Sequence, residues 1–165
     1  MKLRDARVAD LREVASIHVA AWRAAYAGII PDAYLDGLNV EAIRSRRESL
    51  VNEGRSGFLV AEDGDRIVGF AIFGPSPDAD LDRFGQLFAI YVAPDEWHKG
   101  VGTALLAESC ARLAQMGFTN ASLWVLRDNV PARKFYEKHG WAADGHQQEG
   151  DFGSPVSEVR YRRAF

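Results

Sequence analysis

The chain has 165 residues, of which 47% are hydrophobic and 26% charged, and its net charge is −3. This length and composition predict one globular domain over residues 1–165. The charge is balanced and shows no basic block, which argues against nucleic acid or a membrane surface as a partner. No apolar run approaches the ~20 residues of a membrane span, and the start of the chain lacks a signal-peptide core, so we expect a cytoplasmic protein.

The first half of the chain predicts a strand, two helices and a hairpin. Apolar residues that recur every three or four positions predict a helix from about Asp10 to Ala25. The Asp-Gly turn at residues 63–65 is typical of a hairpin. In chain order we expect a strand Met1–Asp5, the first helix, a loop Ile29–Asp32, a helix Val40–Glu53, a break Gly54–Gly57, strands Phe58–Glu62 and Ile67–Phe73, and a polar, mobile loop Gly74–Asp82.

The second half alternates strands and helices. The unbroken apolar run Leu87–Val92 predicts a central strand, Gln86–Ala93, covered on both faces. It is followed by a helix to about Met116, a strand Thr119–Leu126, a helix Val130–His139 and two closing strands, Trp141 onward and Val156–Arg162. This order predicts an α/β fold of the α+β type, in which a mixed sheet has helices on both faces.

A glycine-containing segment, His98–Thr103, lies where the central strand passes into its helix. Gly100 and Gly102 remove two Cβ atoms where free N–H groups and the helix dipole favour a phosphate. A dinucleotide-binding fingerprint would need a third glycine where Leu105 stands, and the Gly-Lys-Ser/Thr of a nucleotide triphosphate loop is absent. The strand, the glycine turn and the helix start together predict a diphosphate cradle, and an ordinary loop-to-helix turn is the alternative.

Two motifs resemble those of the GNAT superfamily of acyl-CoA-dependent N-acetyltransferases. Val92-Ala93-Pro94 followed by Trp97-His98-Lys99-Gly100-Val101-Gly102 is similar to its Val-x-Pro and Gln/Arg-x-x-Gly-x-Gly/Ala signature, and Asn129 to Tyr136 is similar to its Asn-x-x-Ala-x-x-x-Tyr pattern. The resemblance covers nearly the whole chain. It implies a mostly antiparallel sheet of about seven strands, splayed at the cofactor site. Trp97 departs from the signature, and packing under the loop accounts for it.

The resemblance also implies acetyl-CoA as cosubstrate, no metal, and a set of binding residues. Asn129 would help to hold the cofactor, and Tyr136 would lie beside the sulfur as general acid, with a reference pKa of ~10 against ~8.5 for a thiol. Helix capping by Asn129 and inward packing of Tyr136 explain the second motif without any function. The family's backbone contacts fall on His98, Lys99, Gly100, Val101, Gly102 and Thr103 for the diphosphate, and on Ile90, Tyr91 and Val92 for the pantetheine.

The acceptor pocket and the general base are less defined. We expect Trp22, Tyr26, Tyr34 and Gln86 to bind substrate, although an aromatic helix stripe is also typical of a core. Gln86 stands where some family members carry a glutamate, and it cannot take a proton. Glu158 and His146 are the candidate bases, and a solvated surface role is the alternative for each. The amine could instead lose its proton through a chain of water molecules or arrive neutral.

These residues predict direct transfer of an acetyl group to a primary amine of a small molecule or peptide. Cys110, inside a helix, argues against a covalent enzyme intermediate. The alternative is a non-catalytic acyl-CoA-binding module, which Gln86 supports. The basic cluster Arg44, Arg46 and Arg47 fits a solvated helix face. The resemblance is also compatible with a homodimer formed through exposed sheet edges.

Overall fold

The computed structural model describes residues 1–54 and 56–165, so Arg55, in the predicted break Gly54–Gly57, lies outside the described residues. The predicted helices and strands are present, with one addition: a short helix α2 follows Pro31. The strands are β1 Lys2–Asp5, β2 Gly57–Asp63, β3 Arg66–Pro75, β4 Gly85–Val92, β5 Asn120–Leu126, β6 Ala142–Asp151 and β7 Pro155–Ala164. The helices are α1 Leu11–Ala25, α2 Asp32–Asp36, α3 Val40–Glu53, α4 Val101–Gln115 and α5 Val130–Lys138, with one-turn 3-10 helices at Val8–Asp10 and Pro94–Glu96.

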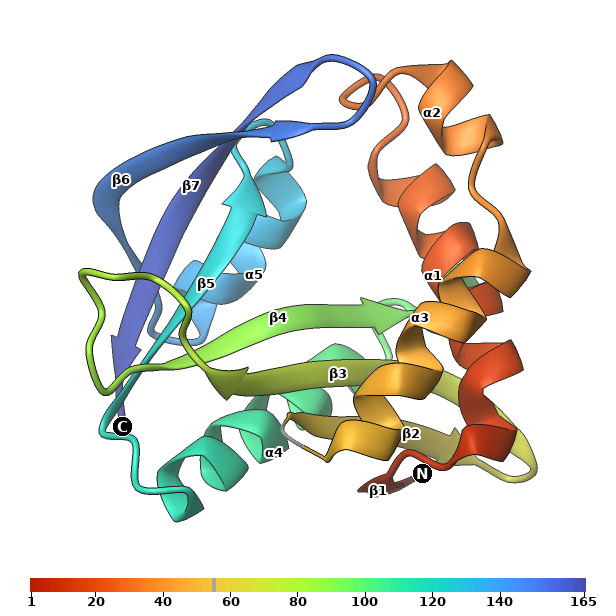
Figure 1. Ribbon diagram of the computed structural model, residues 1–165, viewed down its shortest axis with the longest axis horizontal. Coiled ribbons are helices and arrows are strands. Elements are labelled where there is room, and N and C mark those ends of the chain that lie inside the picture. Colours follow the sequence, from red (N-terminus) through yellow and green to blue (C-terminus); the bar gives the residue numbers. More distant parts are fainter. Residues whose placement is uncertain (55) are drawn as a thin grey trace.

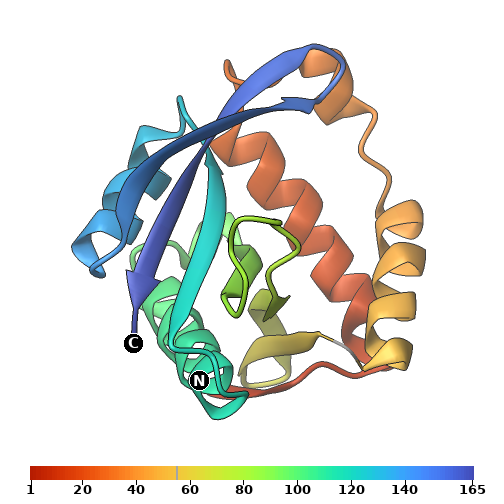
Figure 2. The same cartoon turned by 60° about the vertical axis from the view of Figure 1, so that its left-hand side comes forward.

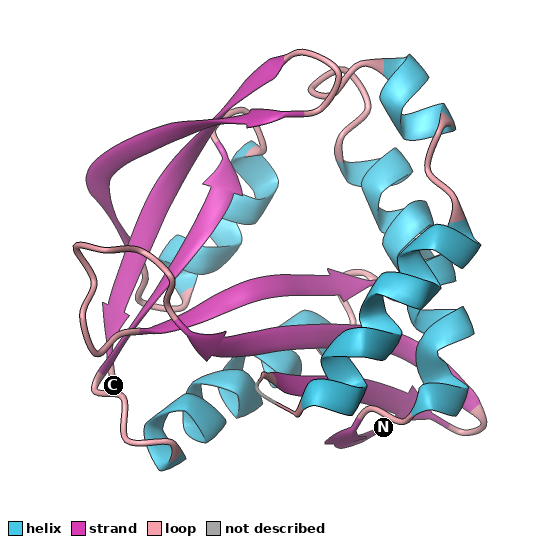
Figure 3. Ribbon diagram, viewed as in Figure 1, coloured by secondary structure: helices cyan, strands magenta, loops and turns pink. Residues whose placement is uncertain are grey.

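The strands form a single seven-stranded sheet in the order β1-β2-β3-β4-β5-β7-β6. Every neighbouring pair is antiparallel except β4 and β5, which run parallel. Helices cover both faces of the sheet (Figure 3). The mixed, mostly antiparallel α/β architecture predicted from the sequence is confirmed.

The sheet opens between β4 and β5. These strands pair only over Gly85–Leu87, whereas β4 pairs with Gly69–Pro75 of β3 from one end of β4 to the other. Phe88 has no partner in β3, because Phe73 pairs with Leu87 and Ile72 with Ala89; such a bulge bends its strand. Beyond it, β4 and β5 diverge, and the molecule forms two arms (Figure 1).

One arm contains β1–β4 with α1, α3 and α4, and the other contains β5–β7 with α5. Their outer ends meet where the β6–β7 turn reaches the α1–α2 region, as both views show (Figures 1 and 2). There Phe152 packs its ring against Trp22 at 5.7 Å and against Tyr34 at 5.7 Å. The opening in the sheet is therefore closed at its far end by aromatic side chains.

The expectation that the central strand is covered on both faces is wrong for its second half. Leu87 is buried, but Phe88 is 42% exposed, and Ile90, Tyr91 and Val92 are only partly buried. The physical reason is the divergence of β5, which leaves this half of β4 beside a cavity instead of beside another strand.

Candidate active site

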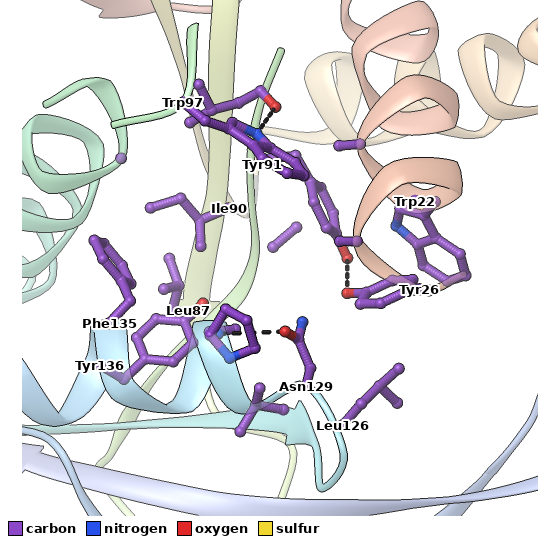
Figure 4. Close-up of a pocket in the computed structure, with 18 of the residues that line it drawn as sticks. Trp22, Tyr26, Leu87, Ile90, Tyr91, Trp97, Leu126, Asn129, Phe135 and Tyr136 are labelled. Carbon is purple, nitrogen blue, oxygen red and sulfur yellow. Dashed lines mark hydrogen bonds between the residues drawn. The ribbon is translucent and has the colours of Figure 1, made fainter. Parts of the chain in front are cut away.

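The space between the two arms is a cavity of about 980 Å³, near the upper end of the usual range for small-molecule sites. Its walls come from α1, β4, the start of α4, β5, α5 and the β6–β7 hairpin. Figure 4 shows Tyr136 and Asn129 on one side of it, Trp22 and Tyr26 on another, and Ile90 between them.

The edge of β4 that faces this cavity carries open backbone groups. Ala93 donates its N–H to Val68 at 2.9 Å and so points toward β3, while the Val92 carbonyl points the other way and accepts from Trp97 Nε1 at 2.8 Å. Because backbone groups alternate along a strand, the N–H and C=O of Ile90 lie on the same open side as the Val92 carbonyl. Ile90 fits the predicted backbone contact, whereas the Val92 carbonyl already has one partner.

Trp97 corrects a prediction from the sequence. Its side chain was expected to pack under the loop, but the residue is 37% exposed and lines the cavity. Its indole N–H is used to bridge the turn back to Val92. Tyr91 points its ring toward α1, where it lies 5.2 Å from the His18 ring and 6.3 Å from that of Trp22.

The start of α4 presents free amides, as the glycine pattern predicts. The N–H groups of residues 98–103 have no acceptor in hydrogen-bonding geometry among residues 1–54 and 56–165. Gly100 has a φ of 87°, and a Cβ on Gly102 would meet only Phe135 and Val92, at ordinary distances of 3.6 Å or more. Gly100 and Gly102 both line the cavity, so these amides border its open space, and the helix dipole makes that space suitable for an anion.

His139 is a residue of this region that the sequence analysis missed. Its Nδ1 lies 2.7 Å from the Phe135 carbonyl, which can only accept, so Nδ1 carries the proton. With the proton on Nδ1, Nε2 is an acceptor, and the Thr103 hydroxyl donates a hydrogen bond to it at 3.2 Å. This contact connects the first turn of α4 to the end of α5 and fixes the Thr103 hydroxyl. The only sequence signal was a histidine at the end of a predicted helix.

Asn129 and Tyr136 lie about two turns apart on the same side of α5. Asn129 is buried; its Oδ1 caps the helix by accepting from the Ala132 N–H at 3.3 Å, and its amide nitrogen points into the cavity (Figure 4). The Tyr136 ring is 8% exposed and packs against Phe135 and Trp141. Burial, followed by the nearby Tyr91, raises the pKa of Tyr136 above its usual value, so its hydroxyl keeps its proton at neutral pH.

Two of the three predicted acceptor aromatics line the cavity. Trp22 and Tyr26 do so, and the Tyr26 hydroxyl lies 3.5 Å from that of Tyr91. Burial and then Tyr91 raise the pKa of Tyr26 well above its usual value, with smaller contributions from Tyr136 and Glu158. Tyr34 does not line the cavity, because it packs behind Trp22 with the two rings 6.4 Å apart.

Gln86 lies at the fork where β4 and β5 separate. It is buried, lines the cavity, and its Oε1 accepts from Ser76 at 2.9 Å and from Ser122 at 3.4 Å. Its carbonyl oxygen is thus used to clamp the β3–β4 loop and β5 to the start of β4.

The two side chains considered as bases lie in different places. His146 is outside the cavity, 3.3 Å from an oxygen of Asp144 and 3.6 Å from one of Asp80, with its side chain 56% exposed. Glu158 lines the cavity, and its Oε2 accepts from Gln148 at 2.8 Å. The structure therefore brings Glu158, and not His146, to the site.

The β3–β4 loop, expected to be mobile, is held by Arg160. This guanidinium is 2% exposed and contacts Asp78, Asp80 and Asp144 at 2.6–3.1 Å. Its hydrogen bonds lower the pKa of Asp80 to about 2. Asp78 also accepts from the indole N–H of Trp124 at 3.1 Å, and Trp124 lines the cavity. The sequence shows the acidic loop but not the distant cation that neutralises it.

The remaining candidates lie elsewhere. Arg44 pairs with Glu41 and Glu48 on an exposed helix face, as expected, whereas Arg47 reaches inward to 3.4 Å from His18 Nδ1. Cys110 is buried in the core, where burial raises the pKa of its thiol. In the described part of the chain, no helix is long and apolar enough to cross a membrane. No group of three His, Cys, Asp or Glu residues arranged to hold a metal occurs in that same part.

Comparisons with known proteins place this site in a family. Residues 15–141 match the model of the acetyltransferase (GNAT) family. An uncharacterized N-acetyltransferase of Bacillus subtilis, YuaI, is 34% identical over 137 residues, which cover 83% of this chain and 78% of that protein. A probable N-acetyltransferase of Mycobacterium tuberculosis, Rv2775, is 32% identical over 148 residues, which cover 88% and 82%.

Solved structures show the same fold. Ribosomal-protein-alanine N-acetyltransferase from Brucella melitensis superposes with a TM-score of 0.79 at 23% identity, covering 100% of both chains. PaiA N-acetyltransferase from Thermoplasma acidophilum, solved in complex with coenzyme A, gives a TM-score of 0.76 at 24% identity and covers 99% of this chain and 98% of that one. The motif match, the open sheet and these similarities agree, and the chain belongs to the GNAT family of acetyltransferases.

Proposed function

We propose that the protein transfers the acetyl group of acetyl-CoA directly to a primary amine, with Tyr136 as the acid that protonates the departing sulfur. The observation that carries this proposal is the content of one cavity: bare amides at α4, an open edge of β4 and the buried Tyr136 phenol. Membership of an acetyltransferase family disfavours the alternative of a non-catalytic acyl-CoA-binding module.

The residues around the cavity suit this cosubstrate. The free N–H groups of residues 98–103 would hold the diphosphate in the part of the cavity that Gly100 and Gly102 line. The open N–H and C=O of Ile90 would pair with pantetheine amides, and Asn129 has its amide nitrogen directed to the same space. Acetyl-CoA supplies a thioester, whose carbonyl carbon is the electrophile.

Tyr136 is suited to the role of acid because it is protonated across the neutral range. Burial keeps its pKa above the usual ~10, whereas a free thiol has a pKa of ~8.5. The same desolvation disfavours a thiolate that forms beside it and so raises the pKa of the departing sulfur, which offsets part of the weaker acidity of the buried phenol. Attack by the amine is direct in this scheme, because Cys110 is buried in the core and does not line the cavity.

The Tyr136→Phe variant tests this role. We expect turnover to fall by about 100-fold, the lower range for loss of a general acid, while the affinity for acetyl-CoA stays within about twofold. Thiol release measures turnover and calorimetry measures affinity. Tyr161→Phe is the control, because it removes a phenol that lies outside the cavity and contacts Arg133 and Glu137. Unchanged turnover in Tyr136→Phe would remove Tyr136 from the mechanism.

A further inference from the structure

The two ends of the cavity differ in charge. Its basic lining residues, His98, Lys138 and His139, all lie beside the end of α5 or the start of α4. Two carboxylates line it, Glu96 and Glu158, and Glu96 pairs with Lys99 at 3.1 Å next to the same α4 turn. At the end lined by Trp22, Tyr26 and Phe152, the charged lining residue among those described is Glu158.

Glu158 is placed in the cavity by its position in the sheet. In β7 it pairs across with Leu126 of β5 and with Gln148 of β6, and both of those residues line the cavity as well. Alternate residues of β7 share a face, so Val156 and Arg160 lie on the same side as Glu158. Val156 belongs to the apolar cluster that contains Trp22 and Tyr26. The carboxylate therefore sits on the inner wall of the β5–β7 arm, next to the aromatic closure.

Within residues 1–54 and 56–165, no basic side chain pairs with Glu158. The nearest cation along its face of β7, Arg160, is already shared among Asp78, Asp80 and Asp144. Gln148 donates to Oε2, and Oε1 has no hydrogen-bond partner in the described part of the chain. A half-buried carboxylate among aromatic rings, without a cation, is suited to receive one from a ligand.

We infer that Glu158 binds the acceptor as an ammonium ion and takes its proton, and that the acceptor is a cationic amine on an apolar or aromatic carbon skeleton without a carboxylate near the nitrogen. The inference rests on the proposed function. In the step, one N–H bond of the ammonium breaks, the proton passes to the Glu158 carboxylate, and the lone pair left on nitrogen is free to attack. The aromatic rings of Trp22 and Phe152 contact the carbon skeleton, and a second carboxylate would be repelled by Glu158.

Two probes of the same skeleton test this substrate class: 2-phenylethylamine, and phenylalanine, which adds a carboxylate beside the amine. With wild-type protein and acetyl-CoA we expect kcat/KM to be at least about 10-fold higher for 2-phenylethylamine. In Glu158→Gln we expect kcat/KM for this amine to fall about 100-fold at pH 7 and the preference between the probes to shrink to about threefold or less. The deficit should narrow toward pH 9.5, as the amine, with a pKa of ~10, loses its proton unaided.

Glu149→Gln is the matched control, since it removes the same charge from an exposed position of the same hairpin that does not line the cavity. We expect wild-type rates for it. Equal rates in Glu158→Gln and wild type, a preference for phenylalanine, or a deficit that is constant with pH would each overturn the inference. Transfer to neither probe by wild-type protein would also overturn this substrate class. Acetyl transfer itself is tested separately, by thiol release with a wider amine library and by Tyr136→Phe.

Discussion

The two ends of the cavity are built in different ways. The cofactor end consists largely of backbone from one continuous stretch, Ile90–Thr103, where glycine and a helix start expose N–H groups. The proposed acceptor end consists of side chains from α1, which ends at Ala25, and from β5 and the β6–β7 hairpin, which begin at Asn120 and Ala142. Recognition by backbone can be encoded locally and reused for one cofactor, whereas recognition by side chains depends on distant segments and is free to vary with the acceptor.

The ends are also held together differently. At the proposed cofactor end, the hydrogen bond between Thr103 and His139 joins the start of α4 to the end of α5. On the β5–β7 arm, Arg160 contacts three carboxylates and thereby fixes the β3–β4 loop, β6 and, through Asp78, Trp124. Because the two ends differ in this way, single substitutions should affect one end without the other.

Arg160→Met should have the largest effect. It leaves Asp78, Asp80 and Asp144 close together without their cation, and we expect a loss of about 3 kcal/mol in the free energy of unfolding. Urea denaturation measures it. The control Arg162→Met removes a 43%-exposed guanidinium that contacts Asp144, and it should cost less than about 1 kcal/mol. Similar losses in both variants would contradict the central role of Arg160.

Gly102→Val should break the cofactor end alone. The added methyl groups occupy the space over the α4 amides, and we expect the affinity for CoA to fall roughly 100-fold, or about 2.7 kcal/mol. Calorimetry measures the affinity and thermal unfolding checks the fold of each variant. In Gly102→Ala the fold should survive, because a Cβ at Gly102 has only ordinary contacts. Gly102→Ala should give an intermediate loss. Normal affinity for CoA in Gly102→Val would contradict the proposal that the amides at the start of α4 bind its diphosphate.

Substitution of His18, whose ring stacks on Trp22, should give the smallest effect, a change in how the free energy of unfolding depends on pH. Burial, then Arg47 and Arg46, lower the pKa of His18 to about 4 from 6.5. Between these values the unfolded chain binds a proton that the folded chain does not, so this residue destabilises the fold as the pH falls from 6.5 toward 4. Relative to His18→Gln, we expect wild type to lose about 2 kcal/mol of unfolding free energy between pH 7 and 4.5. Parallel pH dependences in urea denaturation would show that His18 titrates normally.

The sequence predicts the cofactor end better than the acceptor end for a physical reason. Gly100, Gly102, the Asn129 cap and the strand that precedes them act over a few residues, so their spacing is visible in the chain. The bulge at Phe88, the turn of Trp97 toward Val92 and the packing of Tyr34 behind Trp22 depend on where β5 and the β6–β7 hairpin go. Glu158 and Arg160 lie two residues apart on the same face of β7, and only the sheet register places one in the cavity and the other beside the acidic loop.

The fork at Gln86 has a consequence for which molecules can use the exposed edge of β4. An unpaired strand at the rim of a sheet invites pairing with another protein and hence aggregation. Here the unpaired groups lie inside the molecule, between two arms that are closed at one end by Trp22 and Phe152 and at the other by the Ser76–Gln86–Ser122 clamp. The open N–H and C=O of Ile90 are therefore available to a ligand in the cavity, and they do not lie at the outer rim of the sheet. The fold thus keeps an unpaired strand edge for ligand binding while protecting it from edge-to-edge association with another copy of the chain.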